Sequence, residues 1–203
     1  NIVNELINDG FVIEQARQSA SHSNASIGRK PVILEPDGSV HFALGLYISR
    51  DQAVATLANL KCMIVNEKRC GFAYEESERS FIDKIKAIIS SVAEPEIAAK
   101  GKILGIGVAC IGPLDIRNGV ILEPPNFYRL KSIPVKQILE EEFGYEVYLD
   151  NDMNASALAE KLYGKAKNVS NFVYLGVTNG IGAGIITDNK LFQGDMGFSG
   201  EIG

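Results

Sequence analysis

The stretch Leu149-Asp150-Asn151-Asp152 ends a strand-like run, and an amphipathic helical pattern follows it to about Tyr163. Acidic and amide side chains at such a place can cap the helix, and one of them is enough for that purpose. Three in succession exceed that need, and they lie where side chains reach into the cleft above a sheet. Carboxylates and amides also bind the vicinal hydroxyls of a sugar, because each pairs with adjacent O–H groups. Capping and ligand binding both stay open, and we favour a ligand role for at least one residue.

A glycine-rich run, Asn179-Gly180-Ile181-Gly182-Ala183-Gly184, follows this helix within a predicted hairpin. Its backbone N–H groups could cradle a phosphate, or its small residues could let the hairpin pack closely against a neighbour. No helix with Rossmann or P-loop spacing follows, so both of these nucleotide-binding fingerprints are excluded. Further on, Glu201 lies in a second glycine-rich segment, where a solvated loop acid is the ordinary alternative to a ligand contact.

The order of the remaining elements predicts a mixed α/β class with the start of a second lobe. Alternating apolar residues indicate half-buried strands, a continuous apolar run indicates a strand buried on both faces, and apolar stripes at helical spacing indicate helices that cover a sheet. The predicted strands are at 42–48, 54–60, 71–74, 103–109, 146–149, 172–177 and 181–187, and the predicted helices are at 78–99, 135–143 and 152–163.

The composition is that of an ordinary folded protein, with 46% hydrophobic and 22% charged residues among 203. A net charge of -5 argues against a surface that is entirely a nucleic-acid footprint. The sequence has no apolar run near the roughly 18 residues of a membrane span and no signal peptide, so we expect a cytoplasmic protein. Three cysteines without C-x-x-C spacing and two histidines make a structural zinc site here unfavourable. The chain begins inside a helical pattern and ends within a turn, so we interpret it as a fragment.

The first part of the chain predicts a helix, a strand, a polar loop and a second strand, the order found at the end of a winged helix. A surface helix followed by a flexible hairpin has the same pattern, so both interpretations stay open on these residues alone. The polar loop contains Arg17 and Arg29 and no acid, and a turn at 35–38 separates this part from the rest. The helix is predicted at 1–9, the strands at 11–13 and 31–34, and the loop at 15–29.

A series of short motifs runs through the chain: Gly105-Ile106-Gly107-Val108, Gly112-Pro113-Leu114-Asp115, Gly119-Val120, Pro125-Asn126, Asn151-Asp152-Met153-Asn154-Ala155 with Ala159-Glu160, Gly180-Ile181-Gly182-Ala183-Gly184-Ile185-Ile186, and Gly200-Glu201-Ile202-Gly203. Taken together, in this order and spacing, they resemble the ROK family, whose name joins repressors, open reading frames and kinases. The resemblance covers essentially the whole chain. It implies the two-lobed actin-like, ribonuclease-H-like fold, with a sugar in the cleft between the lobes.

The first hairpin departs from the pattern of the family's kinases, which carry there an acidic residue and a Gly-Gly-Thr turn that approach ATP phosphates. In this chain Tyr47 replaces the acid, and Ser49 and Arg50 replace the two glycines. Asp51 would place a negative charge beside a triphosphate, which Coulomb repulsion disfavours. We therefore expect no enzymatic activity. Repressor members carry an N-terminal winged helix, and the start of this chain resembles the end of that domain.

The resemblance thus implies a sugar-responsive transcriptional repressor, similar to xylose repressors, with a monosaccharide such as xylose or glucose as its effector. The expected sugar contacts are Asn126, Asn151, Asp152 and Glu201, with Asp152 as a hydrogen-bond acceptor. The residues expected to touch DNA phosphates through the wing are Arg17, Arg29 and Lys30. An ATP-dependent sugar kinase with Asp152 as general base, and a scaffold domain that binds no ligand, are the alternatives.

We expect three parts in this chain: 1–38 as the remnant of a winged-helix domain and its linker, 39–165 as the first α/β lobe, and 166–203 as the truncated start of the second lobe. The expected partners are operator DNA, the monosaccharide, and further copies of the protein in a homodimer or homotetramer, but no membrane. No cofactor or metal is expected within these residues. The resemblance allows zinc in the full-length protein, beyond Gly203.

Overall fold

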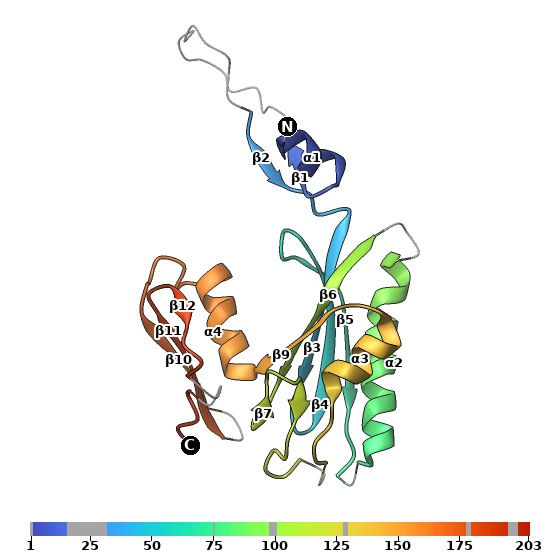
Figure 1. Ribbon diagram of the computed structural model, residues 1–203, viewed down its shortest axis with the longest axis vertical. Coiled ribbons are helices and arrows are strands. Elements are labelled where there is room, and N and C mark those ends of the chain that lie inside the picture. The colour runs from blue at the N-terminus through green and yellow to red at the C-terminus, as the bar shows by residue number, and fades with distance from the viewer. Residues whose placement is uncertain are drawn as a thin grey trace, which may run out of the picture.

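The computed structural model describes residues 2–15, 32–74, 76–97, 101–127, 130–177, 180–194 and 199–203. Figure 1 shows a small N-terminal element, a larger sheet with helices beside it, and a second sheet that carries one helix and the C-terminal end of the chain. Within the described residues, no helix is both long and apolar enough to cross a membrane.

The strands of the larger sheet are β3 His41–Ile48, β4 Gln52–Asn59, β5 Ile64–Gly71, β6 Lys102–Cys110 and β9 Val147–Asn151. They lie in the order β5-β4-β3-β6-β9. β4 pairs antiparallel with both β3 and β5, whereas β6 is parallel to β3 and β9 is parallel to β6. The sheet is therefore mixed, and the carboxyl ends of β3, β6 and β9 meet at one edge, the place where α/β folds form their ligand sites.

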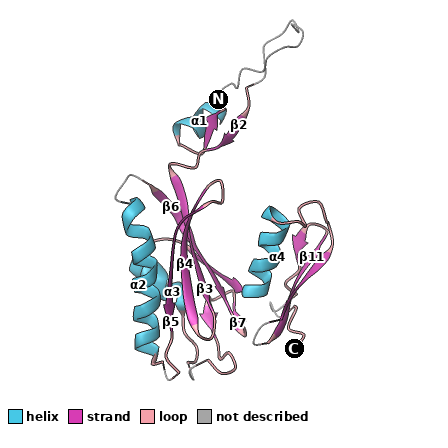
Figure 2. Cartoon of the chain, turned by 180° about the vertical axis from the view of Figure 1, so that it is seen from behind, coloured by secondary structure: helices cyan, strands magenta, loops and turns pink. Residues whose placement is uncertain are grey.

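One face of this sheet is buried beneath two helices, α2 Glu78–Ile97 and α3 Val135–Phe143, which Figure 2 shows together on the same side. Every second residue of β3 and the apolar stripe of α2 supply much of this core, as their periodicity predicts. The buried side chains of these two elements include Phe42, Leu44, Leu46, Ile48, Phe81, Ile85, Ile88, Ile89 and Val92. The mixed α/β class is thereby confirmed.

The third strand of this sheet is not where the sequence predicted it. We predicted a strand at 71–74, but β5 ends at Gly71 and the Tyr74 side chain is 94% exposed. β5 lies at the edge of the sheet and most of its residues are exposed, so its sequence carries charges in place of an apolar alternation. The strand is recognisable by its backbone pairing with β4, which no side-chain pattern reveals.

The N-terminal element contains α1 Ile2–Asn8, β1 Val12–Glu14 and β2 Leu34–Pro36, with β1 and β2 paired antiparallel. The order of helix, strand and strand is as predicted, but the second strand lies at Leu34–Pro36 and not at 31–34, so Glu35 and Pro36 belong to this strand and not to the predicted turn. Most of the polar loop between the two strands lies outside the described residues. The three residues expected to touch DNA lie in that part, so the structure places none of them: Arg17, Arg29 and Lys30.

The second sheet consists of β10 Phe172–Val177, β11 Ile181–Thr187 and β12 Lys190–Leu191. The helix α4 Asp152–Tyr163 packs against this sheet, and Figure 1 shows the two together, apart from the larger sheet. The chain passes from the larger sheet to α4 at Asn151-Asp152. The predicted lobe boundary at residue 165 follows α4 and stays a prediction, but the packing groups α4 with the second sheet. A short hairpin of β7 Leu114–Asp115 and β8 Val120–Ile121 follows β6.

Candidate functional site

A cavity of about 320 Å³ lies between the two sheets, at the edge where β3, β6 and β9 end. From the larger sheet it is lined by Tyr47, the loop residues 49–52, Ile111-Gly112 and Pro125. From the other side it is lined by residues of β10 and β11 and by Gly200, Glu201 and Gly203. Asn151, Asp152 and Met153, where β9 becomes α4, line it between these two sides. Its volume is at the lower end of the range for small-molecule sites.

Asn151 and Asp152 both cap α4 and line this cavity. The Asn151 Oδ1 atom accepts a hydrogen bond of 2.8 Å from the Met153 backbone N–H, and Asp152 Oδ1 accepts one of 2.9 Å from the same group. Capping is therefore part of what these side chains do. The Asn151 amide nitrogen and the second Asp152 oxygen are not used in these bonds, and an amide donor beside a carboxylate acceptor suits a polyhydroxylated ligand.

Asp150, the first residue of the same cluster, has a different environment. Its Oδ1 accepts hydrogen bonds from the Asn151 N–H at 2.7 Å and from Asn154 Nδ2 at 2.8 Å. Its Oδ2 accepts a hydrogen bond of 2.9 Å from Gln193 Nε2, which follows β12. Asp150 does not line the cavity. Its carboxylate instead ties the end of β9 to α4 and to the second sheet.

Glu201 reaches the cavity because of an unusual backbone beside β11. Gly200 has φ +92°, and a side chain there would clash with the Ala183 carbonyl. The Ala183 N–H donates a 2.9 Å hydrogen bond to the Gly200 carbonyl, so this segment lies directly against β11. Glycine at position 200 thus permits a close approach that no other residue could make without strain. The result is that Glu201 faces Gly112, which follows β6, and a Cβ on Gly112 would also lie close to the Asn151 side-chain amide.

The acidic groups of the cavity influence one another. Burial raises the pKa of Asp152 above its ordinary value, and the neighbouring Glu201 charge adds to this rise, whereas the Met153 N–H and Arg50 oppose it. Burial also raises the pKa of Tyr47, and the charges of Asp152 and Asp51 act in the same direction. Three acidic side chains and one guanidinium, that of Arg50, therefore line the site. Such a site favours hydroxyl donors over an anionic ligand.

Arg50 and Asp51 are held by the structure of the first hairpin. The Arg50 Nε donates a 3.1 Å hydrogen bond to the carbonyl of Pro125, and both residues line the cavity. The Ser49 hydroxyl donates one of 2.7 Å to Asp51 Oδ1. The loop is thereby ordered with its charged side chains beside the cavity. In the described part of the chain, no group of three or more His, Cys, Asp or Glu side chains is arranged to hold a metal ion.

The glycines of the hairpin serve close packing at three positions. A Cβ on Gly176 or Gly182 would collide with the Met153 side chain, and one on Gly184 would collide with the Met153 carbonyl and with Ala157. The first turn of α4 therefore rests directly on β10 and β11. By contrast, a Cβ on Gly180 would meet nothing within 4 Å. Of the two interpretations that the sequence left open for the run 179–184, the contacts of α4 account for Gly182 and Gly184 without a phosphate, and Gly176 on the facing strand packs in the same way.

The structure brings together three of the four predicted sugar contacts: Asn151, Asp152 and Glu201. Asn126 is exposed and has φ +57°, and the cavity is lined by its neighbour Pro125 but not by Asn126 itself. Its role as a contact stays a prediction. Sequence reasoning did not identify Gln52, Ile111 or Met153 as lining residues. Their position after the ends of β3, β6 and β9 was the available signal.

Comparisons with known proteins agree with this architecture. A sequence model described as the ROK family matches residues 43–203. The xylose repressor of Caldicellulosiruptor bescii is 34% identical over 204 residues, an alignment that covers 100% of this chain and 49% of that protein. The glucokinase of Thermotoga maritima is 28% identical, with 82% of this chain and 47% of that protein covered. The chain thus spans about half the length of the relatives it matches.

Among solved structures, a ROK family transcriptional regulator described as a homolog of the Escherichia coli Mlc protein superposes with a TM-score of 0.78 at 26% identity. The match covers 98% of this chain and 49% of that one. The fold expected from the motifs, actin-like and ribonuclease-H-like, is confirmed by this likeness together with the observed mixed sheet. The family model covers every residue that lines the cavity, and on these grounds the chain belongs to the ROK family.

Proposed function

We propose that this chain is part of a sugar-responsive transcriptional repressor and that its cavity binds a monosaccharide, such as xylose or glucose, as the effector. The observation that supports this most directly is the convergence of Asn151, Asp152 and Glu201 on one cavity between the two sheets. Their amide and carboxylate groups can accept and donate hydrogen bonds to adjacent hydroxyls. A neutral polyhydroxylated ligand also agrees with the excess of acidic groups around the site.

The extent of the matches favours a regulator over a kinase. The repressor relative and the regulator structure cover 100% and 98% of this chain, whereas the glucokinase covers 82%. The family model begins at residue 43, after α1, β1 and β2. These elements fit the end of a winged helix, whose wing would place Arg17, Arg29 and Lys30 near DNA phosphates. The proposed protein would act on operator DNA in the cytoplasm, as a homodimer or homotetramer.

The position of the cavity supports a mechanism for the response. A sugar held by Glu201 on one side and by Asn151 on the other would bind best when the two sheets lie close together. The ligand would thereby shift the population toward that arrangement. In a symmetric oligomer, such a shift changes how two DNA-binding domains meet their half-sites.

A sugar kinase is the second candidate. The raised pKa of Asp152 and its place in the cavity are compatible with a general base that deprotonates a sugar hydroxyl. Against this stand Tyr47, Arg50 and Asp51, which take the place of the acid and glycines expected beside ATP phosphates. A scaffold that has lost its ligand is the third candidate.

Calorimetric titration of the full-length protein with a panel of pentoses and hexoses tests these candidates. We expect one or more sugars to bind, Asp152→Ala to abolish the binding, and the bound sugar to weaken operator binding. ATP-dependent phosphorylation of any of these sugars would support the kinase instead. Failure of every sugar to bind would leave the scaffold as the best description.

A further inference from the structure

The N-terminal element rests on the body through an aromatic stack. The rings of Phe11, between α1 and β1, and His41, the first residue of β3, have centroids 4.1 Å apart and planes inclined by 14°. His41 is only 3% exposed. Its Nε2 lies 2.8 Å from the Asp9 carbonyl, which can only accept, so Nε2 is the donor. His41 thus contacts both Asp9, which follows α1, and Phe11, which precedes β1.

The remaining contacts at this joint fix the path of the chain around the stack. Gly10 has φ +78°, and a Cβ there would lie 2.9 Å from Val40 Cγ1, so the turn after α1 presses against the residue before β3. The Asp37 N–H donates a 2.9 Å hydrogen bond to the Phe11 carbonyl. The Val40 carbonyl accepts a 2.8 Å bond from the Lys102 N–H at the start of β6. The stack is therefore anchored to two strands of the large sheet.

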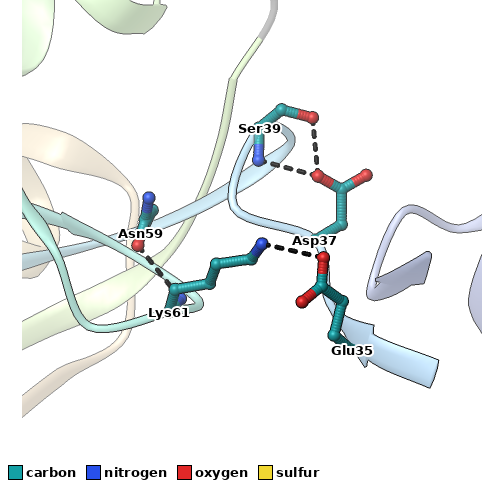
Figure 3. A network of polar contacts seen from close by, with 5 residues as sticks. All are labelled: Glu35, Asp37, Ser39, Asn59 and Lys61. Atoms are coloured by element: carbon teal, nitrogen blue, oxygen red, sulfur yellow. Dashed lines mark hydrogen bonds and ion pairs between the residues drawn. The ribbon is translucent and has the colours of Figure 1, made fainter. Parts of the chain in front are cut away.

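A separate polar network joins β2 to the turn after β4, as Figure 3 shows. Lys61 Nζ lies 3.2 Å from Glu35 Oε1, and the Lys61 N–H donates to Asn59 Oδ1 at 3.0 Å. Asp37 accepts hydrogen bonds only from Ser39, two residues away, in this network. The Lys61 and Glu35 side chains are 34% and 35% exposed, and an ion pair in that environment contributes little. The stack, in which His41 is buried and Phe11 half-buried, is therefore the stronger of the two attachments.

The stack and the cavity lie at opposite ends of one strand. β3 begins at His41 and ends at Ile48, directly after Tyr47, which lines the cavity. β3 is also the central strand, paired with β4 and with β6, with one register irregularity against β6 between Phe42 and Leu44, and its inward side chains are buried. Such a strand moves as a unit, because neighbours on both sides and the core beneath it restrict bending. A displacement at the Tyr47 end would then reach the His41 end of the same strand.

We propose that the Phe11–His41 stack, together with the hydrogen bond of His41 to the Asp9 carbonyl, is the positioning contact that couples the cavity to the N-terminal element. This rests on the proposed function for its regulatory meaning. Neither His41 nor Phe11 lines the cavity. Their role is to make the orientation of β1 and β2 follow the movement of β3.

The first test requires no ligand. In the full-length protein, His41→Ala and Phe11→Leu are each expected to speed amide hydrogen exchange at residues 11–14 by about tenfold or more, because these amides then open independently of the body. Lys61→Ala is the matched control in the same joint, and exchange at 11–14 is expected to stay as in the wild type. Phe11→Leu retains apolar bulk, so it remains informative if His41→Ala does not fold. Unchanged exchange in both stack variants would overturn the proposal, whatever the protein binds.

The second test measures the coupling itself. Operator affinity is determined with and without the sugar that binds, and sugar affinity is determined by calorimetry. We expect both stack variants to keep sugar binding and to reduce the effect of sugar on operator affinity to below about twofold, whereas coupling in regulated proteins is usually fivefold or more. Lys61→Ala should retain the wild-type effect. A full effect in the stack variants would overturn the coupling role. If the wild type binds no sugar, the proposed function fails. The exchange test still decides whether the stack holds the N-terminal element to the rest of the protein.

Discussion

The Glu201 carboxylate occupies the space that a side chain on Gly112 would need. A Cβ placed on Gly112 would lie 2.7 Å from Glu201 Oε1 and 3.3 Å from Asn151 Nδ2. Gly112 follows β6 of the large sheet, Glu201 lies beside β11 of the second, and Asn151 ends β9, where the chain passes into α4. The absence of a side chain at one position thus allows groups from both sheets to converge.

Replacing Gly112 tests whether this convergence is needed for ligand binding. We expect Gly112→Ala to displace Glu201 and to weaken sugar binding by about tenfold or more, since a hydrogen bond from a charged group contributes about 1.5–3 kcal/mol. Calorimetric titration with the sugar that binds the wild type measures the change. Gly107→Ala is the matched control, because a Cβ at Gly107 in β6 meets nothing within 4 Å. Equal sugar affinity in the wild type and Gly112→Ala would contradict the proposed placement of Glu201 at the sugar.

Asp152 is expected to bind the ligand at a cost to stability. Burial raises its pKa above the ordinary value of 3.8, so the ionised form is disfavoured in the folded state. Protonated Asp152 places no charge in the folded state, so its contribution to stability is most favourable at low pH. This contribution is lost as the pH rises through the raised pKa of Asp152. Asp152→Asn should therefore raise the melting temperature at pH 7, with a gain that disappears below about pH 4, the ordinary carboxyl range. The same variant should lose sugar affinity by about tenfold or more. A lower melting temperature at pH 7 would contradict this account.

The contribution of Glu76 to stability is expected to depend on pH in the opposite way from that of Asp152. It is 6% exposed, lies 2.6 Å from Lys84 Nζ, and accepts a 2.7 Å hydrogen bond from the Ala73 N–H. Hydrogen bonds from the Lys84 and Ser80 side chains and the Ala73 N–H lower its pKa to about 2 from the ordinary value of 4.5. Its contribution is therefore present above pH 4.5 and is lost as the pH falls toward 2. Glu76→Gln should destabilise the fold by about 1.5–3 kcal/mol at pH 7, measured by urea denaturation.

The pH series supplies the decisive comparison for Glu76. The difference between wild type and Glu76→Gln should shrink steadily between pH 4.5 and 2. Glu67→Gln removes an exposed ion pair with Arg69 on β5 and should change stability by less than about 1 kcal/mol. A destabilisation by Glu76→Gln that does not vary with pH would show that the carboxylate charge is not responsible.

Substitutions at two glycines of the hairpin distinguish a role in close packing from a role in phosphate binding. Gly184→Ala should destabilise the protein by about 1–3 kcal/mol, because the new methyl group collides with the Met153 carbonyl and Ala157 at the first turn of α4. Gly180→Ala adds its methyl group in open space and should have a small effect. Urea denaturation of both variants tests this. A phosphate cradle would give the reverse result, with little change in stability and a loss of nucleotide binding in Gly180→Ala.

The sequence predicted those parts of the fold whose side chains meet a core. The alternation in β3 and the apolar stripe of α2 repeat with the period of their element, so strand and helix were assigned correctly. The edge strand β5 was misplaced, because it is held by backbone hydrogen bonds to β4 and its side chains are mostly exposed. The apolar run at 71–74 predicts a strand, but β5 ends at Gly71.

For the candidate site, the sequence identified the types of residue but not which residues lie beside one another in the structure. Asp150, Asn151 and Asp152 are adjacent in the chain and looked equivalent as ligand groups. The structure distinguishes them. The Asp150 carboxylate accepts hydrogen bonds from Asn154 and Gln193, whereas Asn151 and Asp152 line the cavity.

The sequence by itself determined the mixed α/β class, the family motifs and the unusual first hairpin, because each depends on local periodicity or on residue types at fixed spacing. Only the tertiary structure decided that Gly112, Asn151 and Glu201 meet, that Met153 accounts for three glycines, and that His41 stacks on Phe11. These relationships join residues far apart in the chain. They depend on how two sheets and a small N-terminal element pack together, and no local pattern in a sequence records that arrangement.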